Sequence, residues 1–422
     1  MHNYEVAHAA RVTVLDADKF KRCRVSINFI WPCSRKAANA TALLSFMMER
    51  GYADCPDMTE LSKRLAKLYG ASLAVDTGTN GANRVLSVSV TGIKDAYAIE
   101  GENLTRDYAD LMFGVAFRPF LVDGVFDAQA LDIEREKLRE LLESEINEKR
   151  TYCIRQARRK FFGDAPEGVE RLGYVEELDS ITPADVTAAY HEMLRMAQVE
   201  VLVLGADDAV VRTALQNALA GLNRTPCPLP AFSAQPRQEE AAYTQAIDAV
   251  QGKLCLLFTC EKPVPKTEFS AVRVAVALFG GTPTSRLFMN VREKESLCYY
   301  CAAGYSQFTG MLMVDSGIEH KNAAKAKAAI LRELNNVING DIAEKELRET
   351  KASLINHLTA MEDNLSSLES WHFTELLAGT QHTPAEVASE INAVTAADIK
   401  KALQHFTLSV SYLLTSAENA AQ

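Results

Sequence analysis

The chain has 422 residues, of which 48% are hydrophobic and 24% charged, as in globular proteins with more than one domain. Its formal net charge of −10 disfavours nucleic acid and anionic membranes as partners, because phosphate groups are bound by clustered Lys and Arg. There is no apolar run of about 18 residues and no signal-peptide pattern, and the nine scattered cysteines predict free thiols, so we expect a cytoplasmic protein.

The first half of the chain mixes strand and helix signals. Apolar runs rich in Val, Ile and Phe predict strands, and apolar positions three to four residues apart predict helices. The expected elements are, in chain order, strands at 11–14 and 24–29, a helix at 40–50, a strand at 84–90, a long charged helix at 127–149, a helix at 181–190 and a strand at 199–205.

Residues 224–243 are predicted to form a linker. Four prolines in RTPCPLPAFSAQPRQEE exclude a regular helix or a central strand there. A second set of elements follows, with a strand at 253–259, helices at 269–278 and 284–293, a strand at 311–317, a charged helix at 342–357, a helix at 394–403 and a strand at 408–415.

The two halves repeat one another. ITPADVTAAY, with Thr182 as the expected N-cap, recurs as VTAADIKKAL, with Thr395 in that role, and a strand follows each copy. The repeat predicts two homologous domains, 1–223 and 244–422. Because strands are mixed with pairs of helices, we expect an α+β fold in which each domain has a mixed or antiparallel sheet with helices packed on one face.

Residues 280–300, GGTPTSRLFMNVREKESLCYY, hold the strongest functional signal. Arg292 and Tyr299 lie on either side of a predicted helix-to-strand junction, where a guanidinium and a phenol would offer hydrogen-bond donors to a ligand. A simpler interpretation is that Arg292 pairs with Glu293 or Glu295 on a surface turn. Cys298 and Cys301 form a CxxC sequence, but on a regular strand a step of three would point them to opposite faces, which argues against a redox or zinc site.

This block, together with DSGI at 315–318 and MMERGYADCPDMTELSKRL at 47–65, resembles the pitrilysin/insulinase metallopeptidases, or inverzincins, over nearly the whole chain. The chain is most similar to zinc-less bacterial members associated with modification of elongation factor P. The resemblance implies a pitrilysin-like, LuxS/metallohydrolase-like layout. It also implies that Arg292 and Tyr299 bind peptide substrate, because the family's Arg and Tyr face the zinc across a cavity.

The zinc motif of the family is missing. Alignment on Arg50–Gly51 places Ala42, Ser45 and Phe46 at the positions of H-x-x-E-H, and the third-ligand position falls on Glu143. A methyl group and a phenyl ring have no lone pair for zinc, and a serine cannot replace the carboxylate base.

No relocated zinc site is apparent. No two of the eight histidines are four residues apart, so no helix presents the usual pair. The resemblance therefore implies a member without metal, cofactor or catalytic residues, which is not an enzyme on its own.

Three functional hypotheses remain. The chain is the non-zinc subunit of a heteromeric protease, as in the mitochondrial processing peptidase, and supplies peptide contacts to a zinc-bearing paralogue. Alternatively it is a stand-alone peptide- or protein-binding scaffold, for example a homodimer. The third hypothesis, an independent enzyme with an unrecognised site, finds no Ser/His/Asp or Cys/His constellation to support it.

Overall fold

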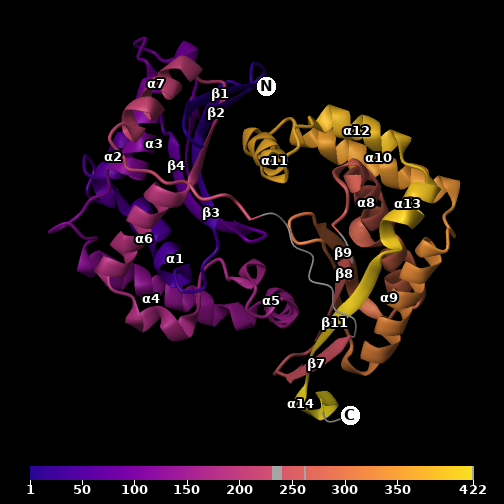
Figure 1. Cartoon of the computed structure of the whole chain (residues 1–422). Coiled ribbons are helices and arrows are strands. Elements are labelled where there is room, and N and C mark those ends of the chain that lie inside the picture. The colour runs from indigo at the N-terminus through magenta and orange to yellow at the C-terminus, as the bar shows by residue number, and fades with distance from the viewer. Residues whose placement is uncertain (231–239, 261–262, 421–422) are drawn as a thin grey trace. The chain divides into compact units, whose positions relative to one another are not determined.

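The structure, a computed structural model, describes residues 1–230, 240–260 and 263–420 (Figure 1). The chain divides into two compact units, each built on one sheet. The first unit contains the described residues from 1–143, 169–231 and 365–373, and the second contains those from 144–168, 232–364 and 374–422. No helix in this described part of the chain is long and apolar enough to cross a membrane.

The sheet of the first unit has six strands in the order β1-β2-β6-β3-β5-β4. The strands are β1 (His2–Ala7), β2 (Ala10–Leu15), β3 (Arg22–Pro32), β4 (Ser72–Asn80), β5 (Asn83–Ile93) and β6 (Gln198–Leu204). Strands β2 and β6 run parallel, and the other neighbouring pairs are antiparallel. The strong alternation of β3 places Val25, Ile27 and Phe29 in the core beneath the helices.

Helices cover one face of this sheet, as Figure 1 shows. They are α1 (Ala38–Arg50), α2 (Met58–Lys67), α3 (Leu104–Phe117), α4 (Ala128–Ser144), α6 (Pro183–Met196) and α7 (Asp208–Leu219). From the second half of the sequence, the first part of α11 (Leu365–Ala378) also belongs to this unit. Its Glu369 accepts a hydrogen bond of 2.5 Å from Arg24 of β3, which also donates to Thr91 of β5.

The sheet of the second unit has five strands in the order β7-β11-β8-β10-β9. They are β7 (Ala241–Ala246), β8 (Gly252–Cys260), β9 (Cys298–Ser306), β10 (Met311–Ile318) and β11 (Phe406–Thr415). Only the pair of β7 and β11 is parallel among these described strands. Residues 231–239 of the predicted linker lie outside the described residues, and β7 already includes residues 241–243.

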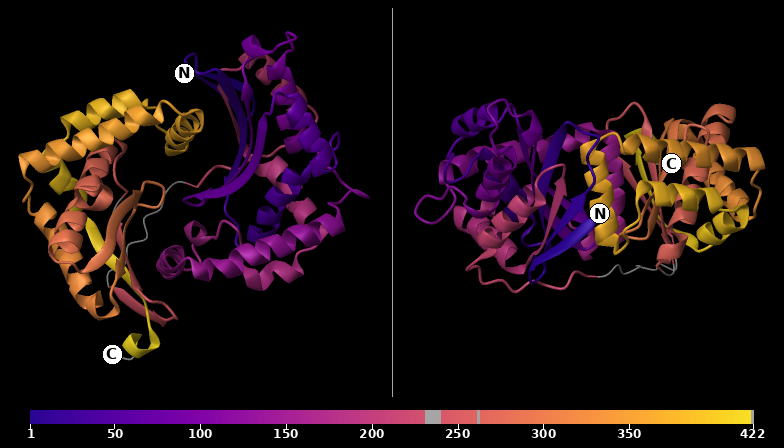
Figure 2. Two further views of the ribbon diagram at one scale, coloured as in Figure 1. Left: turned by 180° about the vertical axis from the view of Figure 1, so that it is seen from behind. Right: turned by 90° about the horizontal axis from the view of Figure 1, so that it is seen from above.

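Helices of the second unit gather on one face of its sheet, seen from behind in Figure 2. They are α8 (Phe269–Val276), the π-helical segments η6 (Ala277–Gly281) and η7 (Leu287–Lys294), α9 (Ala323–Ile338), α10 (Glu344–Met361), α12 (Pro384–Ala393) and α13 (Ala396–Leu403), with α14 (Ala417–Ala420) at the end. Helix α5 (Lys149–Phe162), from the first half of the sequence, packs on the opposite face, where Phe161 joins a buried cluster with Leu257 and Tyr412.

The repeated helix starts have the predicted caps. Thr182 and Thr395 each accept a hydrogen bond from the backbone N–H of the aspartate three residues later, and each aspartate accepts one from the backbone of its threonine. Strands β6 and β11 follow these helices and each pairs in parallel with one neighbour. The predicted α+β class, with mixed sheets and helices on one face, is confirmed.

Candidate functional site

Helix α1 buries the positions where the zinc motif would lie. Ala42 has no exposed surface, and Ser45 is 5% exposed. The Ser45 hydroxyl donates to the backbone oxygen of Ala42 at 2.7 Å, so its hydrogen bond stays inside the helix. Phe46 is partly buried and packs against the core. These three side chains do not fit a zinc ion, because none of them is an imidazole, thiolate or carboxylate ligand.

The acidic residue that α4 turns toward α1 is Glu134. Its side chain is buried and accepts hydrogen bonds from Arg50 of α1 at 2.6 Å and from Lys137 at 2.8 Å. Glu143, the predicted third-ligand position, is exposed near the end of α4. Burial, followed by the charge of Glu134, raises the pKa of Glu49. Glu143 is therefore exposed to solvent, whereas Ala42 and Ser45 are buried.

Sequence reasoning missed Glu134, although a signal was present. The buried positions of α4 follow the three- and four-residue spacing of a helix face, and Glu134 occupies one of them between leucines. The buried positions are Leu131, Glu134, Leu138 and Leu142. Across residues 1–230, 240–260 and 263–420, no group of three or more His, Cys, Asp or Glu side chains is placed to hold a metal ion.

A tight turn at residues 295–297 connects η7 to β9, and the two predicted binding residues flank it, Arg292 in η7 and Tyr299 in β9. Ser296 adopts a left-handed conformation with φ of 51°, and its backbone N–H donates to the Arg292 carbonyl at 3.1 Å. The Leu297 N–H donates to the Val291 carbonyl at 3.1 Å. These bonds close the end of η7 and reverse the chain into β9.

The close packing around Gly280 explains why this block begins with a glycine. A Cβ atom at this position would lie 2.7 Å from the side chains of Ala303 in β9 and Leu287 in η7. Only glycine lets the backbone approach these neighbours so closely. The close contact packs η6 against both η7 and the strand, so the Gly-Gly sequence positions the turn and forms no phosphate cradle.

Arg292 and Tyr299 are both accessible on this turn. The Arg292 guanidinium lies over the Phe288 ring, 4.5 Å from its centroid, and pairs with Glu293 at 3.4 Å. The Arg292 side chain is 38% exposed, and Tyr299 is 50% exposed. The predicted pairing with Glu293 is thus confirmed. Such exposed ion pairs contribute about 0–1 kcal/mol, so an incoming carboxylate or carbonyl oxygen can replace Glu293.

Strand β9 contains a bulge that corrects the expected geometry of the two cysteines. Cys298 lies opposite Ile318 of β10, whereas Tyr300 lies opposite Gly317, so Tyr299 is an extra residue in the strand. Cys301 lies opposite Ser316, two residues before Ile318. The prediction that the cysteines point to opposite faces was wrong, because the bulge turns the odd step of three into an even one.

Comparisons with known proteins identify the relatives of this chain. A model described as "Peptidase M16 inactive domain" matches residues 180–354. The "Probable inactive metalloprotease YmfF" of Bacillus subtilis (strain 168) is 26% identical over 409 residues, which cover 97% of this chain and 96% of that protein. A conserved protein from Enterococcus faecalis V583 superposes with a TM-score of 0.90 at 29% identity and covers 98% of both chains. The chain is thus similar to M16 peptidase homologues that are described as inactive.

Other M16 relatives agree in fold. The "peptidase M16 inactive domain from Pseudomonas fluorescens" superposes with a TM-score of 0.76 at 16% identity, covering 99% of this chain and 98% of that chain. The "Uncharacterized zinc protease YmxG" of B. subtilis (strain 168) is 30% identical over 120 residues, or 28% of this chain and 29% of that protein. The predicted membership of the pitrilysin/insulinase family is confirmed.

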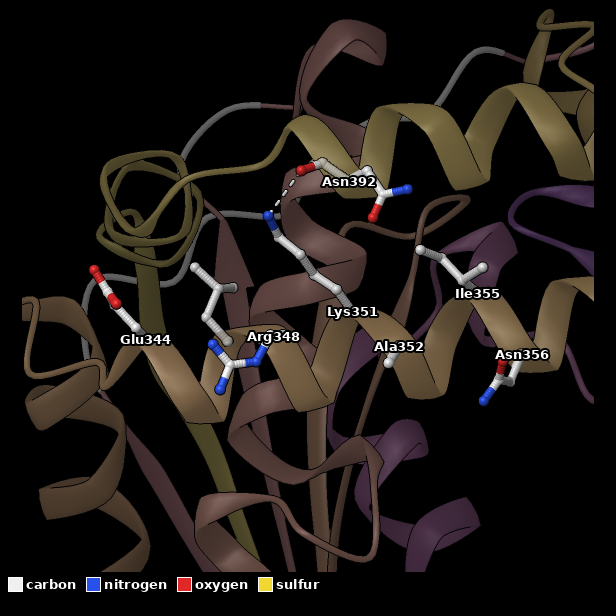
Figure 3. A pocket seen from close by; sticks show the side chains of 8 residues that line it. Glu344, Arg348, Lys351, Ala352, Ile355, Asn356 and Asn392 are labelled. Atoms are coloured by element: carbon white, nitrogen blue, oxygen red, sulfur yellow. Dashed lines mark hydrogen bonds between the residues drawn. The ribbon is translucent and has the colours of Figure 1, made fainter.

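The M16 homologue also has surface grooves away from these residues. A groove of about 560 Å³ lies along α10 and α12, where Lys351 donates to the Asn392 carbonyl at 2.9 Å (Figure 3). Two further grooves, of about 480 and 700 Å³, lie in the first unit. The linings of these three grooves contain neither the turn residues Arg292 and Tyr299 nor Ala42, Ser45 and Phe46. Arg292 and Tyr299 remain the candidate site because they are accessible and are the residues that the sequence predicted to bind a ligand.

Proposed function

We propose that this inactive M16 homologue is the non-zinc subunit of a heteromeric protease and binds the peptide that a zinc-bearing paralogue cleaves. One contrast carries the proposal. Ala42 and Ser45 are buried in the core where the zinc motif would lie, whereas Arg292 and Tyr299 stay exposed on a well-defined turn.

The chemistry of the two side chains suits a peptide. A guanidinium offers a planar fork of N–H donors that matches carboxylate and carbonyl oxygens. The contact with Phe288 leaves the edge of the Arg292 guanidinium open to a ligand while it limits the side chain's rotation. The Tyr299 hydroxyl supplies one further donor, suited to an oxygen on which negative charge develops during peptide cleavage.

The relatives support a partnership of two kinds of chain. Bacillus subtilis (strain 168) has both a "Probable inactive metalloprotease" and an "Uncharacterized zinc protease" that resemble this chain. A heteromeric protease needs one subunit of each kind in the same cell. The partner that we propose is accordingly a zinc-bearing M16 paralogue from the same organism.

A stand-alone peptide-binding scaffold is the second candidate. Strands β4 and β9 lie at the ends of their sheets in the described part of the structure, so each offers a row of backbone donors and acceptors. An extended peptide can add to such an edge without being cleaved. A homodimer that binds peptides in the absence of a paralogue would support this function.

Reconstitution tests the proposal. The purified chain is mixed with the zinc-bearing paralogue, and complex formation is measured by light scattering after size-exclusion chromatography. Cleavage is followed with internally quenched fluorescent peptides. We expect a stable complex that cleaves faster than the paralogue alone. A complex that forms without faster cleavage, or no complex at all, would contradict the proposal.

The substitution Arg292→Ala tests whether Arg292 contributes to peptide binding in the reconstituted complex. We expect kcat/KM of the complex to fall roughly 10- to 150-fold, which corresponds to the loss of about 1.5–3 kcal/mol from hydrogen bonds to a charged group. Arg348→Ala is the matched control, because Arg348 is also an exposed arginine of the second unit and lies on α10. Equal effects of the two substitutions would remove Arg292 from the site.

A further inference from the structure

The bulge in β9 gathers a thiol pair beside the proposed binding turn. Cys298 and Cys301 lie opposite Ile318 and Ser316, which are two residues apart on β10 and therefore share a face. This face is the one opposite to α5, because Arg150 of α5 binds Asp315, which directly precedes Ser316 on β10 and therefore points to the other side. Both sulfur atoms therefore project to the same side of the sheet.

The two thiols are also electrostatic neighbours. Each shifts the pKa of the other, and the hydroxyl of Ser316, which donates to the Tyr300 carbonyl at 2.9 Å, lowers the pKa of both. Cys298 is half-buried and Cys301 is buried. The pair thus consists of one thiol that a small reagent can reach and a second thiol directly behind it.

The surroundings make Cys298 the more reactive of the two. The hydrogen bond from Cys301, then the Ser316 hydroxyl and the charge of Arg292, lower the pKa of Cys298 against the opposing effect of burial. The pKa of Cys301 is raised well above its ordinary value, first by the hydrogen bond with Cys298 and then by burial. Because the thiolate is the nucleophilic form, Cys298 is the attacking thiol and Cys301 the resolving thiol.

We propose that Cys298 and Cys301 form a redox-active pair that a hydroperoxide oxidises to a disulfide. The Cys298 thiolate attacks the outer peroxide oxygen, forming an S–O bond while the O–O bond breaks, and the departing alkoxide or hydroxide takes up a proton. Cys301 then attacks the Cys298 sulfur, forming the S–S bond, and hydroxide leaves as water with the Cys301 proton. Two electrons pass from the two thiols to the peroxide.

Formation of this bond requires the bulge to close, because the Cβ atoms of a disulfide lie about 3.5–4.5 Å apart. The two Cα atoms are separated by approximately the rise of two strand residues, about 6.7 Å. This value is near the upper end of the range for disulfides, about 4.4–6.8 Å. Closing the bond draws the ends of the bulge together and so changes the position of Tyr299, which lies between the cysteines. Control of peptide binding by this change rests on the proposed function, whereas the oxidation itself does not.

Peroxide titration of the reduced full-length chain tests the pair. After treatment, free thiols are blocked with N-ethylmaleimide and the chain is digested with trypsin, which leaves both cysteines in the peptide from Glu295 to Lys321. We expect this peptide to lose two hydrogen atoms and to escape alkylation before Cys33 and Cys227, the other half-buried thiols, are oxidised. Double alkylation of the peptide after Cys227 has been oxidised would overturn the proposal.

Variants separate the roles of the two thiols. In Cys301→Ser, we expect no disulfide and a Cys298 sulfenic acid that dimedone traps, and in Cys298→Ser neither product. Arg292→Gln should shift the pH dependence of Cys298 alkylation upward. Cys227→Ser is the control and should retain the disulfide. A Cys301→Ser chain in which Cys298 remains a free thiol under the same peroxide treatment would overturn the assignment of Cys298 as the attacking thiol.

The effect on function is measured separately. The chain is oxidised alone, freed of peroxide and then mixed with its zinc-bearing paralogue. We expect slower peptide cleavage with the oxidised wild-type chain and unchanged cleavage with the peroxide-treated Cys298→Ser chain. If the reduced chain gives no cleavage, the proposed function fails while the disulfide result stands. If cleavage occurs and oxidation leaves its rate unchanged, the inference that the disulfide controls peptide binding through Tyr299 is wrong.

Discussion

Helix α1 and the turn from Arg292 to Tyr299 are the two regions where the resemblance to active peptidases places functional residues. On α1, the side chains at these positions are small or apolar and lie in the core, as Ala42 does with no exposed surface. On the turn, two donors remain accessible, and one of them is held over an aromatic ring. The positions of the missing zinc motif are therefore packed in the core, whereas the two residues proposed to bind peptide are accessible.

The difference has a physical basis. A histidine or glutamate in a core without its metal is a buried polar group with no partner, which costs about 1–3 kcal/mol. Replacement by Ala42 and Phe46 removes that cost. An exposed arginine or tyrosine carries no such penalty, because water solvates it. Stability alone therefore favours small or apolar side chains at the zinc-motif positions and places no such constraint on the turn residues.

Restoring the zinc motif in α1 should have the largest effect. We expect the triple substitution Ala42→His, Ser45→Glu and Phe46→His to lower the free energy of unfolding by about 3 kcal/mol or more, because it overpacks the core and buries polar groups. Thermal unfolding and zinc content measure the outcome.

The matched control for the triple substitution is Ala324→His with Ala328→His on α9. These residues are exposed and have the same four-residue spacing. We expect this pair to change stability by less than about 0.5 kcal/mol. A triple variant that unfolds at the wild-type temperature and binds one zinc ion would contradict this prediction, because α1 would then accept the zinc motif without loss of stability.

Loss of Glu134 should have the next largest effect. Glu134→Ala removes the acceptor that links α4 to Arg50 of α1. We expect the free energy of unfolding to fall by about 2–3 kcal/mol. This is less than the loss for a fully buried ion pair, because the side chains of Arg50 and Lys137 are partly exposed to water. Glu136→Ala is the control, since Glu136 is exposed on the same helix. Urea denaturation of both variants gives the comparison, and equal midpoints would contradict a structural role for Glu134.

Much of the fold was predictable because it depends on local signals. The repeated capping sequences placed Thr182 and Thr395 at helix starts, and both caps are present. The alternating residues of β3 and β5 indicated strands that the sheet contains. The exchange of helices was not predictable. The apolar face of α5 indicates that this helix packs against a sheet. Periodicity does not indicate which sheet, and α5 packs against the sheet formed by the second half of the sequence.

The site was only partly predictable for a similar reason. The motif block located Arg292 and Tyr299, and their exposure agrees with a surface site. The bulge at Tyr299 has no clear sequence signal, yet one extra residue reverses the face of every later side chain and brings Cys298 to the side of Cys301.

Removal of the Tyr299 hydroxyl should have a moderate effect on activity and none on folding. We expect Tyr299→Phe to lower kcat/KM of the reconstituted protease by roughly 5- to 30-fold, or about 1–2 kcal/mol for one lost donor. Tyr97→Phe is the control, because Tyr97 is 49% exposed, much like Tyr299 at 50%. Unchanged cleavage with Tyr299→Phe would leave Arg292 as the sole contact of the pair.

Ser45→Ala should have the smallest effect on both stability and cleavage. The Ser45 hydroxyl donates only to the Ala42 carbonyl one turn earlier, at 2.7 Å, a bond that competes with the helix backbone. Alanine is the better helix former, so we expect the free energy of unfolding to change by less than about 0.5 kcal/mol. Cleavage by the reconstituted protease should also stay at the wild-type rate, because this hydroxyl is buried in α1 and reaches no substrate. A slower rate with unchanged stability would mean that α1 still acts on the peptide, and the division between a packing half and a binding half would fail.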